Sequence, residues 1–323
     1  MKFQSITTAA AAALIACASA AAAQDYPRGN ITFTVPFPPG GGTDIPARMI
    51  VDSISRQTGW TFVVQNQPGA GGNIGLAQVA RTTPDGMNIG MGQTSNLAVN
   101  PTLYPDIPYD VLNDFTPIAV VTSQPMAIVT HAGSPFETFA DVIEAARAAP
   151  GDVLYGTPGA GTVAHLSVEL LSTENGLEMA HVPYPGIAQA ISDVMAGGVD
   201  IYVGSVPSVL PHIRSGSLRA LAVTAPERNP ALPETPAVAE FGFEGFNTAD
   251  WKAIVGPANL SPEVVATLNT AINAALEDPT LRAALEAEGS VVVGGTPEEF
   301  QAFLAEQVET WAEVVRASGA TVN

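Results

Sequence analysis

Short apolar runs alternate with amphipathic stretches through the first third of the chain. Ile31–Phe37 is an apolar run bounded by turn residues, which predicts a buried strand. In Asp44–Thr58 the apolar residues recur at three- and four-residue spacings, which predicts a helix with one buried face. The same patterns predict strands over Phe62–Gln65 and Asn88–Gly92 and a helix over Asn73–Thr82. Because strands and helices alternate, we expect a parallel sheet with right-handed crossovers.

The alternation begins again in the middle of the chain. The segment 155–170, YGTPGAGTVAHLSVEL, has the same order as the segment 36–50, PFPPGGGTDIPARMI: a strand end, a Pro-Gly loop, a threonine and a helix. This echo between the two halves indicates two similar lobes that face each other. The further predicted strands are 127–130, 153–156, 180–183, 200–204 and 218–224, and the further predicted helices are 139–148, 163–172 and 187–196.

Two amphipathic helices are predicted near the end of the chain, after a return strand at Trp251–Val255. The helix up to Leu276 has Ser261 as its N-cap, and the helix that ends at Ser318 opens with Thr296 and Glu299 at capping-box spacing. We expect both helices to pack back on the first lobe.

These patterns together predict an α/β fold with two lobes. The first lobe is expected to be discontinuous, over residues 24–123 and 249–323, and the second to be continuous, over residues 124–248. Two crossover strands would then join the lobes.

Residues 1–23 have the pattern of an export signal. A lysine follows the initiating methionine, residues 7–16 are apolar, and Ala21–Ala23 is a small-residue cleavage site. An alternative is a lipoprotein cleavage box that would leave a lipid anchor at Cys17, the only cysteine of the chain. The apolar run is too short for a permanent span. We therefore expect an exported, periplasmic protein with a cleavable signal peptide and no stable membrane span.

The charge balance excludes some partners. The 323 residues include 12 basic and 31 acidic side chains, for a net charge of −19. Nucleic-acid binding requires a basic face, so no nucleic-acid partner is expected. The acidic surface favours a soluble monomer. If the ligand is an anion, local hydrogen-bond donors have to bind it against the field of the whole protein.

Enzyme motifs are incomplete in this chain. Gly42 is followed by Thr43 and not by the lysine of a P-loop. Residues 159–164 match G-x-G-x-x-A, but the strand after them lacks the acidic residue that would hold a ribose. His165 and Glu169 have helical i,i+4 spacing that would suit a metal, with a packed histidine as the alternative. We expect no cofactor, no metal and no catalytic residues.

Two glycine-rich loops favour a binding site for a small anion. One precedes the helix at 44–58 and the other the helix at 163–172. The first amides of a helix have no partner within the helix, and this end carries a partial positive charge. Such an end binds an anion without a basic side chain. Thr43 and Thr162 would add hydroxyl groups, and plain tight turns are the alternative interpretation.

The combined motifs resemble the substrate-binding proteins of tripartite tricarboxylate transporters, often called the Bug family. The resemblance covers essentially the whole chain after the signal. It implies a type II periplasmic binding protein-like fold, in which two α/β lobes joined by two crossover strands close around a ligand. The motifs are PFPPGGGTD with Arg48, NQPGAGGNIG with Asn66, PDG at 84–86, NPTLY at 100–104, PGDVLYGTPGAGTVAHL, HVPYPG at 181–186, GGVD and SGSLRALAVT.

The resemblance implies a receptor that captures a small organic carboxylate and delivers it to membrane permease subunits. The alternative is an exported α/β hydrolase that acts on a small anionic substrate. Asp44 is more typical of a structural residue than of a direct ligand contact. The residues that the resemblance implies at the ligand are Phe37, Pro38, Gly40, Gly41, Gly42, Thr43, Asp44, Gln93, Thr94, Ser95, Thr157, Gly159, Ala160, Gly161, Thr162, His165, Tyr184, Gly204 and Ser205.

The far end of the predicted site departs from the family pattern. Many relatives carry a lysine where this chain has Pro185, and no basic residue stands near the distal loops. The ligand would then be a monocarboxylate or have a neutral far end. Asp250 would suit a ligand amine, with a surface position as the alternative.

Overall fold

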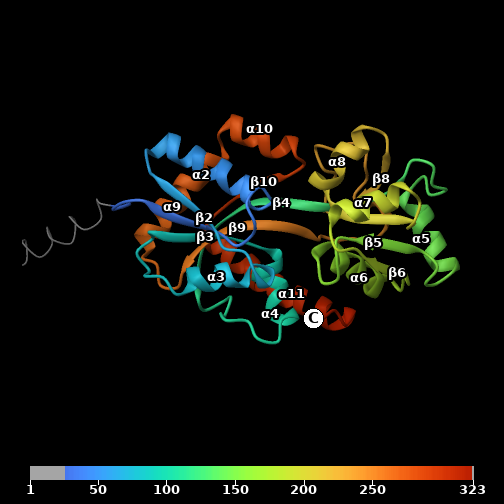
Figure 1. Ribbon diagram of the computed structural model, residues 1–323, viewed down its shortest axis with the longest axis horizontal. Helices are drawn as coiled ribbons and strands as arrows, with labels where there is room; N and C mark the ends of the chain where they lie inside the picture. The colour runs from blue at the N-terminus through green and yellow to red at the C-terminus, as the bar shows by residue number, and fades with distance from the viewer. Residues whose placement is uncertain (1–25, 322–323) are drawn as a thin grey trace, which may run out of the picture.

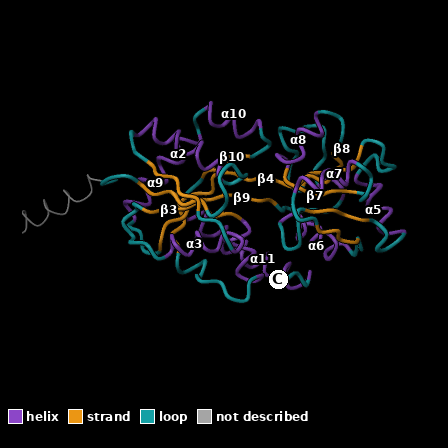
Figure 2. The backbone as a smooth tube through the Cα atoms, in the orientation of Figure 1, coloured by secondary structure: helices purple, strands orange, loops and turns teal. Residues whose placement is uncertain are grey.

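Two α/β lobes share two long strands, β4 (Phe115–His131) and β9 (Ala249–Pro257), in the computed structural model (Figure 1). The structure describes residues 26–321, so the predicted signal at 1–23 and Cys17 lie outside the described residues. In both lobes the strands lie in the middle and the helices cover the outer faces (Figure 2).

The first lobe is built on a mixed sheet. β1 (Ile31–Val35) pairs in parallel with β2 (Phe62–Asn66) and with β3 (Asn88–Gln93), as the alternating pattern predicted. β9 then pairs antiparallel with β3 and with the first part of β4, whose other edge accepts β10 (Val291–Gly294). The helical elements of this lobe are η1 (Ala70–Gly72), α2 (Asp44–Thr58), α3 (Asn73–Ala80), η2 (Ser95–Val99), α4 (Asn100–Leu103), α9 (Pro262–Leu276) and α10 (Pro279–Ala287).

The second lobe repeats the parallel arrangement around the end of β4. β5 (Leu154–Thr157) pairs in parallel with β6 (Ala180–Pro183) and with β7 (Ile201–Ser205). β7 and β8 (Leu218–Val223) lie antiparallel on the two edges of β4. The helical elements here are α5 (Phe139–Ala148), α6 (Val163–Asn175), α7 (Ile187–Met195), α8 (Val206–Arg214) and η3 (Val238–Phe241).

The two connections between the lobes lie side by side. Pro125 of β4 is in register with Ala249 of β9. Thr224, which follows β8, binds both connections: its hydroxyl accepts the Met126 amide at 2.9 Å, and its carbonyl accepts the Thr248 amide at 3.0 Å. The two crossovers are therefore held together at the point where the chain leaves and re-enters the first lobe.

Each lobe has a core of its own between the sheet and its helices. In the first lobe, Phe33 and Ile50 belong to a buried cluster between the sheet and α2 and α9. In the second lobe, Tyr202 and Val209 belong to a buried cluster against α7 and α8. None of the helices within residues 26–321 combines the length and the apolar character that crossing a bilayer requires.

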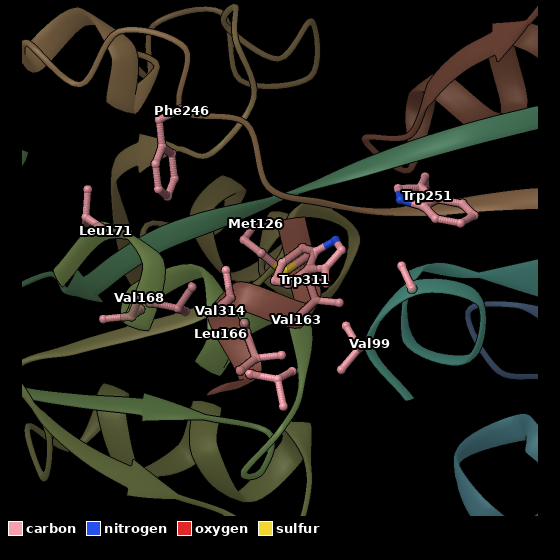
Figure 3. Close-up of a cluster of buried hydrophobic side chains, with 14 of the residues drawn as sticks. Val99, Met126, Val163, Leu166, Val168, Leu171, Phe246, Trp251, Trp311 and Val314 are labelled. Atoms are coloured by element: carbon pink, nitrogen blue, oxygen red, sulfur yellow. The ribbon is translucent and has the colours of Figure 1, made fainter. Parts of the chain in front are cut away.

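The last helix, α11 (Pro297–Ser318), packs on both lobes. It begins with the capping box that the sequence predicted, because Thr296 Oγ1 accepts the Glu299 amide and Glu299 Oε2 accepts the Thr296 amide. Beyond the expected contacts with η2 and α4 of the first lobe, it contacts α6 of the second lobe. Figure 3 shows Trp311 among Met126, Val163 and Leu166, which belong to the same hydrophobic cluster. This helix therefore gives the lobes a shared core.

Candidate functional site

A cavity of about 360 Å³ lies between the lobes, and we call it the interlobe cavity. The crossover strands β4 and β9 contribute Met126 and Asp250 to its wall. The other lining residues come from loops and helix ends of both lobes. They are Phe37, Gly71, Gln93, Ser95, Asn100, Leu103 and Tyr104 from the first lobe, and Pro158, Ala160, Gly161, Thr162, Val163, Ala164, Ile187 and Ser205 from the second.

Three helices of the second lobe begin at this cavity. Val163 and Ile187 are the first residues of α6 and α7, and Ser205 is the N-cap of α8, and all three line the cavity. The first-turn amides of a helix lack partners within the helix and carry a partial positive charge. The second lobe therefore presents several positive helix ends to one small space.

The loop at 158–162 lies at the cavity wall, as the sequence predicted for its position before a helix. Thr162 caps α6, because its hydroxyl accepts the His165 amide at 3.3 Å. The same hydroxyl donates to the Gly159 carbonyl at 2.8 Å, so the loop is closed on itself. Gly161 has a φ of +73°, and a Cβ there would come within 2.9 Å of Leu103 Cδ2 in the first lobe. A side chain at position 161 would thus require Leu103 to shift and would be strained by the positive φ.

The glycine loop of the first lobe lies beside the cavity and not in its lining. Only Phe37, at its start, contributes to the wall, while Pro38 and residues 40–43 do not. The loop is connected to the wall by Thr43, whose hydroxyl donates to Gln93 Oε1 at 2.5 Å. The structure therefore gives this loop a supporting position.

Asp44 holds that loop in place through hydrogen bonds. Its carboxylate accepts the Gly40 amide at 2.8 Å, Arg48 Nε at 2.8 Å and Asn66 Nδ2 at 2.8 Å. Burial alone would raise the pKa of Asp44, but the hydrogen bonds from Arg48, Gly40 and Asn66 hold its pKa below the ordinary value. Both carboxylate oxygens are thus occupied by the protein. This agrees with a structural residue better than with a direct ligand contact.

The predicted residues Thr94, Gly204 and Tyr184 lie outside the cavity lining. The buried Thr94 hydroxyl donates to the Ala249 carbonyl and accepts the Trp251 amide, each at 2.9 Å, which ties the end of β3 to β9. Gly204 is buried, and a Cβ there would come within 2.6 Å of the Tyr202 ring. The Tyr184 ring lies beside Gly156 and is not among the lining residues, and its hydroxyl donates to Asp193. Burial and this contact raise the pKa of Tyr184 to about 12.

Two histidines are stacked directly behind the loop of the second lobe. The rings of His165 and His181 lie 4.0 Å apart, and the Tyr155 ring stacks on His181. His165 Nδ1 accepts the Gly161 amide at 3.1 Å, which requires this nitrogen to be unprotonated. His181 Nε2 lies 2.7 Å from the Thr157 hydroxyl. The two imidazoles therefore set the position of the loop without lining the cavity.

Both histidines resist protonation in the folded protein. Burial lowers the pKa of His165, although Glu169, whose Oε1 lies 3.6 Å from His165 Nε2, opposes the shift. Burial, followed by the neighbouring His165, lowers the pKa of His181 to about 4. Tyr155 donates its hydroxyl to Glu169 Oε1 at 2.5 Å, so the Glu169 carboxylate interacts with both Tyr155 and His165.

We expect the thermal unfolding midpoint to fall as the pH is lowered from about 6.5 to about 4. In this window the unfolded chain binds a proton at His181 that the folded protein, with a pKa of about 4, does not bind. Protons then favour the unfolded state, so stability is full above the ordinary pKa and declines toward the folded pKa. Circular dichroism melts at several pH values measure the effect.

The matched variant for this test is His181→Phe, which keeps a stacked ring but cannot titrate. Its midpoint should fall less than that of the unsubstituted protein over the same pH range. His212→Asn, at the end of α8, serves as the control and should leave the pH dependence unchanged. Parallel curves for His181→Phe and the unsubstituted protein would show that the histidine pair does not control this loss.

Several lining residues carried no sequence signal of their own. Asn100 and Tyr104 stand in the NPTLY motif, which contributed to the resemblance without indicating a cavity. Met126 and Ile187 looked like ordinary apolar residues of a strand and a helix. Their role depends on which elements meet in space. The lining residues that the sequence analysis did not assign to the site are Gly71, Asn100, Leu103, Tyr104, Met126, Val163, Ala164 and Ile187.

The interlobe cavity can bind an anion through neutral donors. Its lining within residues 26–321 includes no lysine, arginine or histidine, and its polar neutral side chains include Gln93, Ser95 and Ser205. Among the hydrogen bonds of the described residues, none joins a histidine to either serine.

Comparison with known proteins gives consistent matches over most of the chain. Residues 46–320 match the family model described as Tripartite tricarboxylate transporter family receptor. The chain is 37% identical to Protein BugT of Bordetella pertussis, over 95% of this chain and 94% of that protein.

Two solved structures are similar in both sequence and fold. One is Rpa4515 of R. palustris with adipate, at 34% identity, a TM-score of 0.78 and coverage of 92% of this chain and 99% of that one. The other is MatC of Rhodopseudomonas palustris with bound malate, at 27% identity, a TM-score of 0.74 and coverage of 90% and 100%.

Proposed function

The chain belongs to the tripartite tricarboxylate transporter receptor family, and from this premise we propose that it captures a small carboxylate-bearing solute between its lobes. We further propose that it acts in the periplasm and delivers the solute to the membrane subunits of such a transporter. The observation that carries the proposal is the interlobe cavity, where three helix N-termini meet and, among residues 26–321, no basic side chain lines the wall.

Similar proteins support a carboxylate as the solute class. Rpa4515 was solved with adipate and MatC with malate, and both are small organic acids. In this chain, the carboxylate would accept hydrogen bonds from the loop at 158–162 and the start of α6. A positive helix end suits an anion for the reasons of geometry and charge given above. The predicted first-lobe loop at 40–43 would act through Phe37 and Gln93.

Closure of the lobes would bring these groups together. We propose that the lobes comprise residues 24–123 with 249–323 and residues 124–248, and that they move about the paired crossovers near Pro125 and Ala249. Gly161 and Leu103 are cavity-lining residues from different lobes, and a Cβ at position 161 would come within 2.9 Å of Leu103 Cδ2, so their approach would form as the lobes close.

A thermal-shift screen against organic acids tests the proposal. A ligand present at about one hundred times its Kd stabilises the folded state by about 2.7 kcal/mol. We expect at least one carboxylate to raise the unfolding midpoint accordingly, with the acid recovered unchanged by mass spectrometry. Absence of any shift across the acid library would overturn the proposal. Conversion of the acid into a product would favour the exported hydrolase instead.

A further inference from the structure

Asp250 is the only charged side chain among the described residues that line the interlobe cavity. It projects from β9, and its nearest cation is Lys252, whose Nζ lies 3.2 Å from Oδ2. The Lys252 side chain is 1% exposed and the Asp250 side chain 21%. Lys252 also donates to Gln124 Oε1 at 2.8 Å. The ammonium group is thus buried beside the carboxylate, and Asp250, unlike Lys252, belongs to the cavity lining.

The Asp250 carboxylate retains free acceptor capacity. Its Oδ1 is buried and has no hydrogen-bond partner within the described part of the chain. An ionised carboxylate accepts about four hydrogen bonds, and Lys252 supplies one of them. Buried polar atoms are nearly always paired in folded proteins, so an unpaired one calls for a partner. The terminal torsion of aspartate is broad, so a small rotation presents either oxygen to the cavity.

The rest of the cavity lining prefers a ligand group of the opposite charge to the one that Asp250 prefers. The helix starts at Val163, Ile187 and Ser205 favour a negative group, for the reasons given above. Asp250 stands on β9 and favours a hydrogen-bond donor, above all a positively charged one. A second carboxylate placed against Asp250 would be repelled, since Lys252 stands on the far side of the pair and has no surface in the lining. The cavity lining therefore combines groups that prefer a negative partner with one that prefers a positive partner.

We propose that the solute carries an ammonium group in addition to its carboxylate, so that it is an amino acid in zwitterionic form and not a diacid. This inference rests on the proposed function, because it assigns the second charged group of the same ligand. The carboxylate binds at the helix starts of the second lobe, and the ammonium group donates to Asp250. Asp250 is then the residue that determines specificity.

Matched series of acids test the inference on the unsubstituted protein. For chains of four, five and six carbons, calorimetry compares the ω-amino acid with the diacid and the plain monoacid of the same length. We expect the best ω-amino acid to bind at least about tenfold more tightly than both of its partners, the size of one charge-assisted hydrogen bond. Equal or tighter binding of the diacid or the monoacid at every length overturns the inference and leaves the proposed function standing. If no acid binds, both fail.

Variants of the ion pair give a second measurement. Asp250→Asn should remove the ammonium preference and, because Lys252 loses its counter-ion, shift the preference toward the diacid. The double variant Asp250→Asn with Lys252→Met removes both charges and should bind the amino acid and the diacid within about threefold of each other. This double variant also keeps the test available if the single one does not fold, since it leaves no unpaired buried charge. Asp152→Asn, on the surface of the second lobe, is the matched control. An ammonium preference that persists in the Asp250 variants overturns the inference.

Discussion

Replacing Trp311 by alanine is expected to lower the free energy of unfolding by about 3–5 kcal/mol, the range for a large buried aromatic side chain. Trp311 is 2% exposed and lies among Met126, Val163 and Leu166 (Figure 3). Its indole N–H donates to Gln307 Oε1 at 3.1 Å, and this partner would lose the bond as well. Chemical denaturation followed by circular dichroism measures the change.

The size of this loss should reflect the position of Trp311 between the lobes. Trp60→Ala removes the same side chain from a half-buried place on the first lobe, where it packs edge-on against Tyr26. We expect that control to cost clearly less. We also expect the Trp311 variant to unfold over a broader transition, because the lobes lose part of the core that couples them. A loss no larger than that of Trp60→Ala would show that α11 contributes little to joining the lobes.

Local sequence signals located most helices and strands. α2 was predicted over its full length, Asp44–Thr58, because its apolar spacing is regular. In the structure it ends at Gly59, which has a φ of +75°. The expected α/β alternation and the two-lobed, type II-like architecture are confirmed by the structure and by the similar solved proteins. These features depend on short stretches of sequence, and that is why they could be predicted.

Elements that contain proline were shortened or missed. β4 was predicted only at 127–130, yet it begins at Phe115, since Pro117 and Pro125 interrupt its apolar pattern. Proline is tolerated there because β4 pairs irregularly with β9, with register shifts near Pro117. α8 was not predicted at all, because Pro207 lies in its first turn and Pro211 inside it. Tertiary contacts override local preference in both elements.

The residues of the candidate site were also predicted only in part. The loop at 158–162 was placed at the ligand by its position between a strand and a helix, and it lines the cavity. The matching loop at 40–43 has the same local pattern, but its residues are not among the lining residues. The Asp44 carboxylate accepts hydrogen bonds from Gly40 of this loop and from Arg48 and Asn66. The start of α7 was not predicted at the ligand, and Ser205 at the start of α8 was implied only by the family resemblance. They reach the cavity only through the parallel order of the sheet, which puts the carboxyl ends of β6 and β7 at one edge.

An aspartate introduced into the loop at 158–162 should prevent the carboxylate of the ligand from binding there. We expect Ala160→Asp to weaken binding of the solute by at least about 100-fold, since two like charges about 4 Å apart near a protein surface repel by about 4 kcal/mol. Ala160 is exposed and lines the interlobe cavity two residues before the N-cap Thr162. The new side chain would therefore occupy the space in front of the α6 amides. This prediction rests on the proposed function and uses any acid found in the thermal-shift screen.

In the Ala160→Asp variant, binding of the solute should be weakened while the stability of the fold is retained. A negative charge near a helix start is favourable, so Ala160→Asp should unfold at the same temperature as the unsubstituted protein or slightly above it. Ala160→Ser adds a polar group of similar size without charge and should bind nearly normally. Ala132→Asp, in the exposed turn after β4, adds the same charge away from the cavity and should also bind normally. If Ala160→Asp binds the acid as tightly as Ala160→Ser does, the amides at the start of α6 do not hold the carboxylate of the ligand. A fixed negative charge in front of these amides would otherwise have weakened binding.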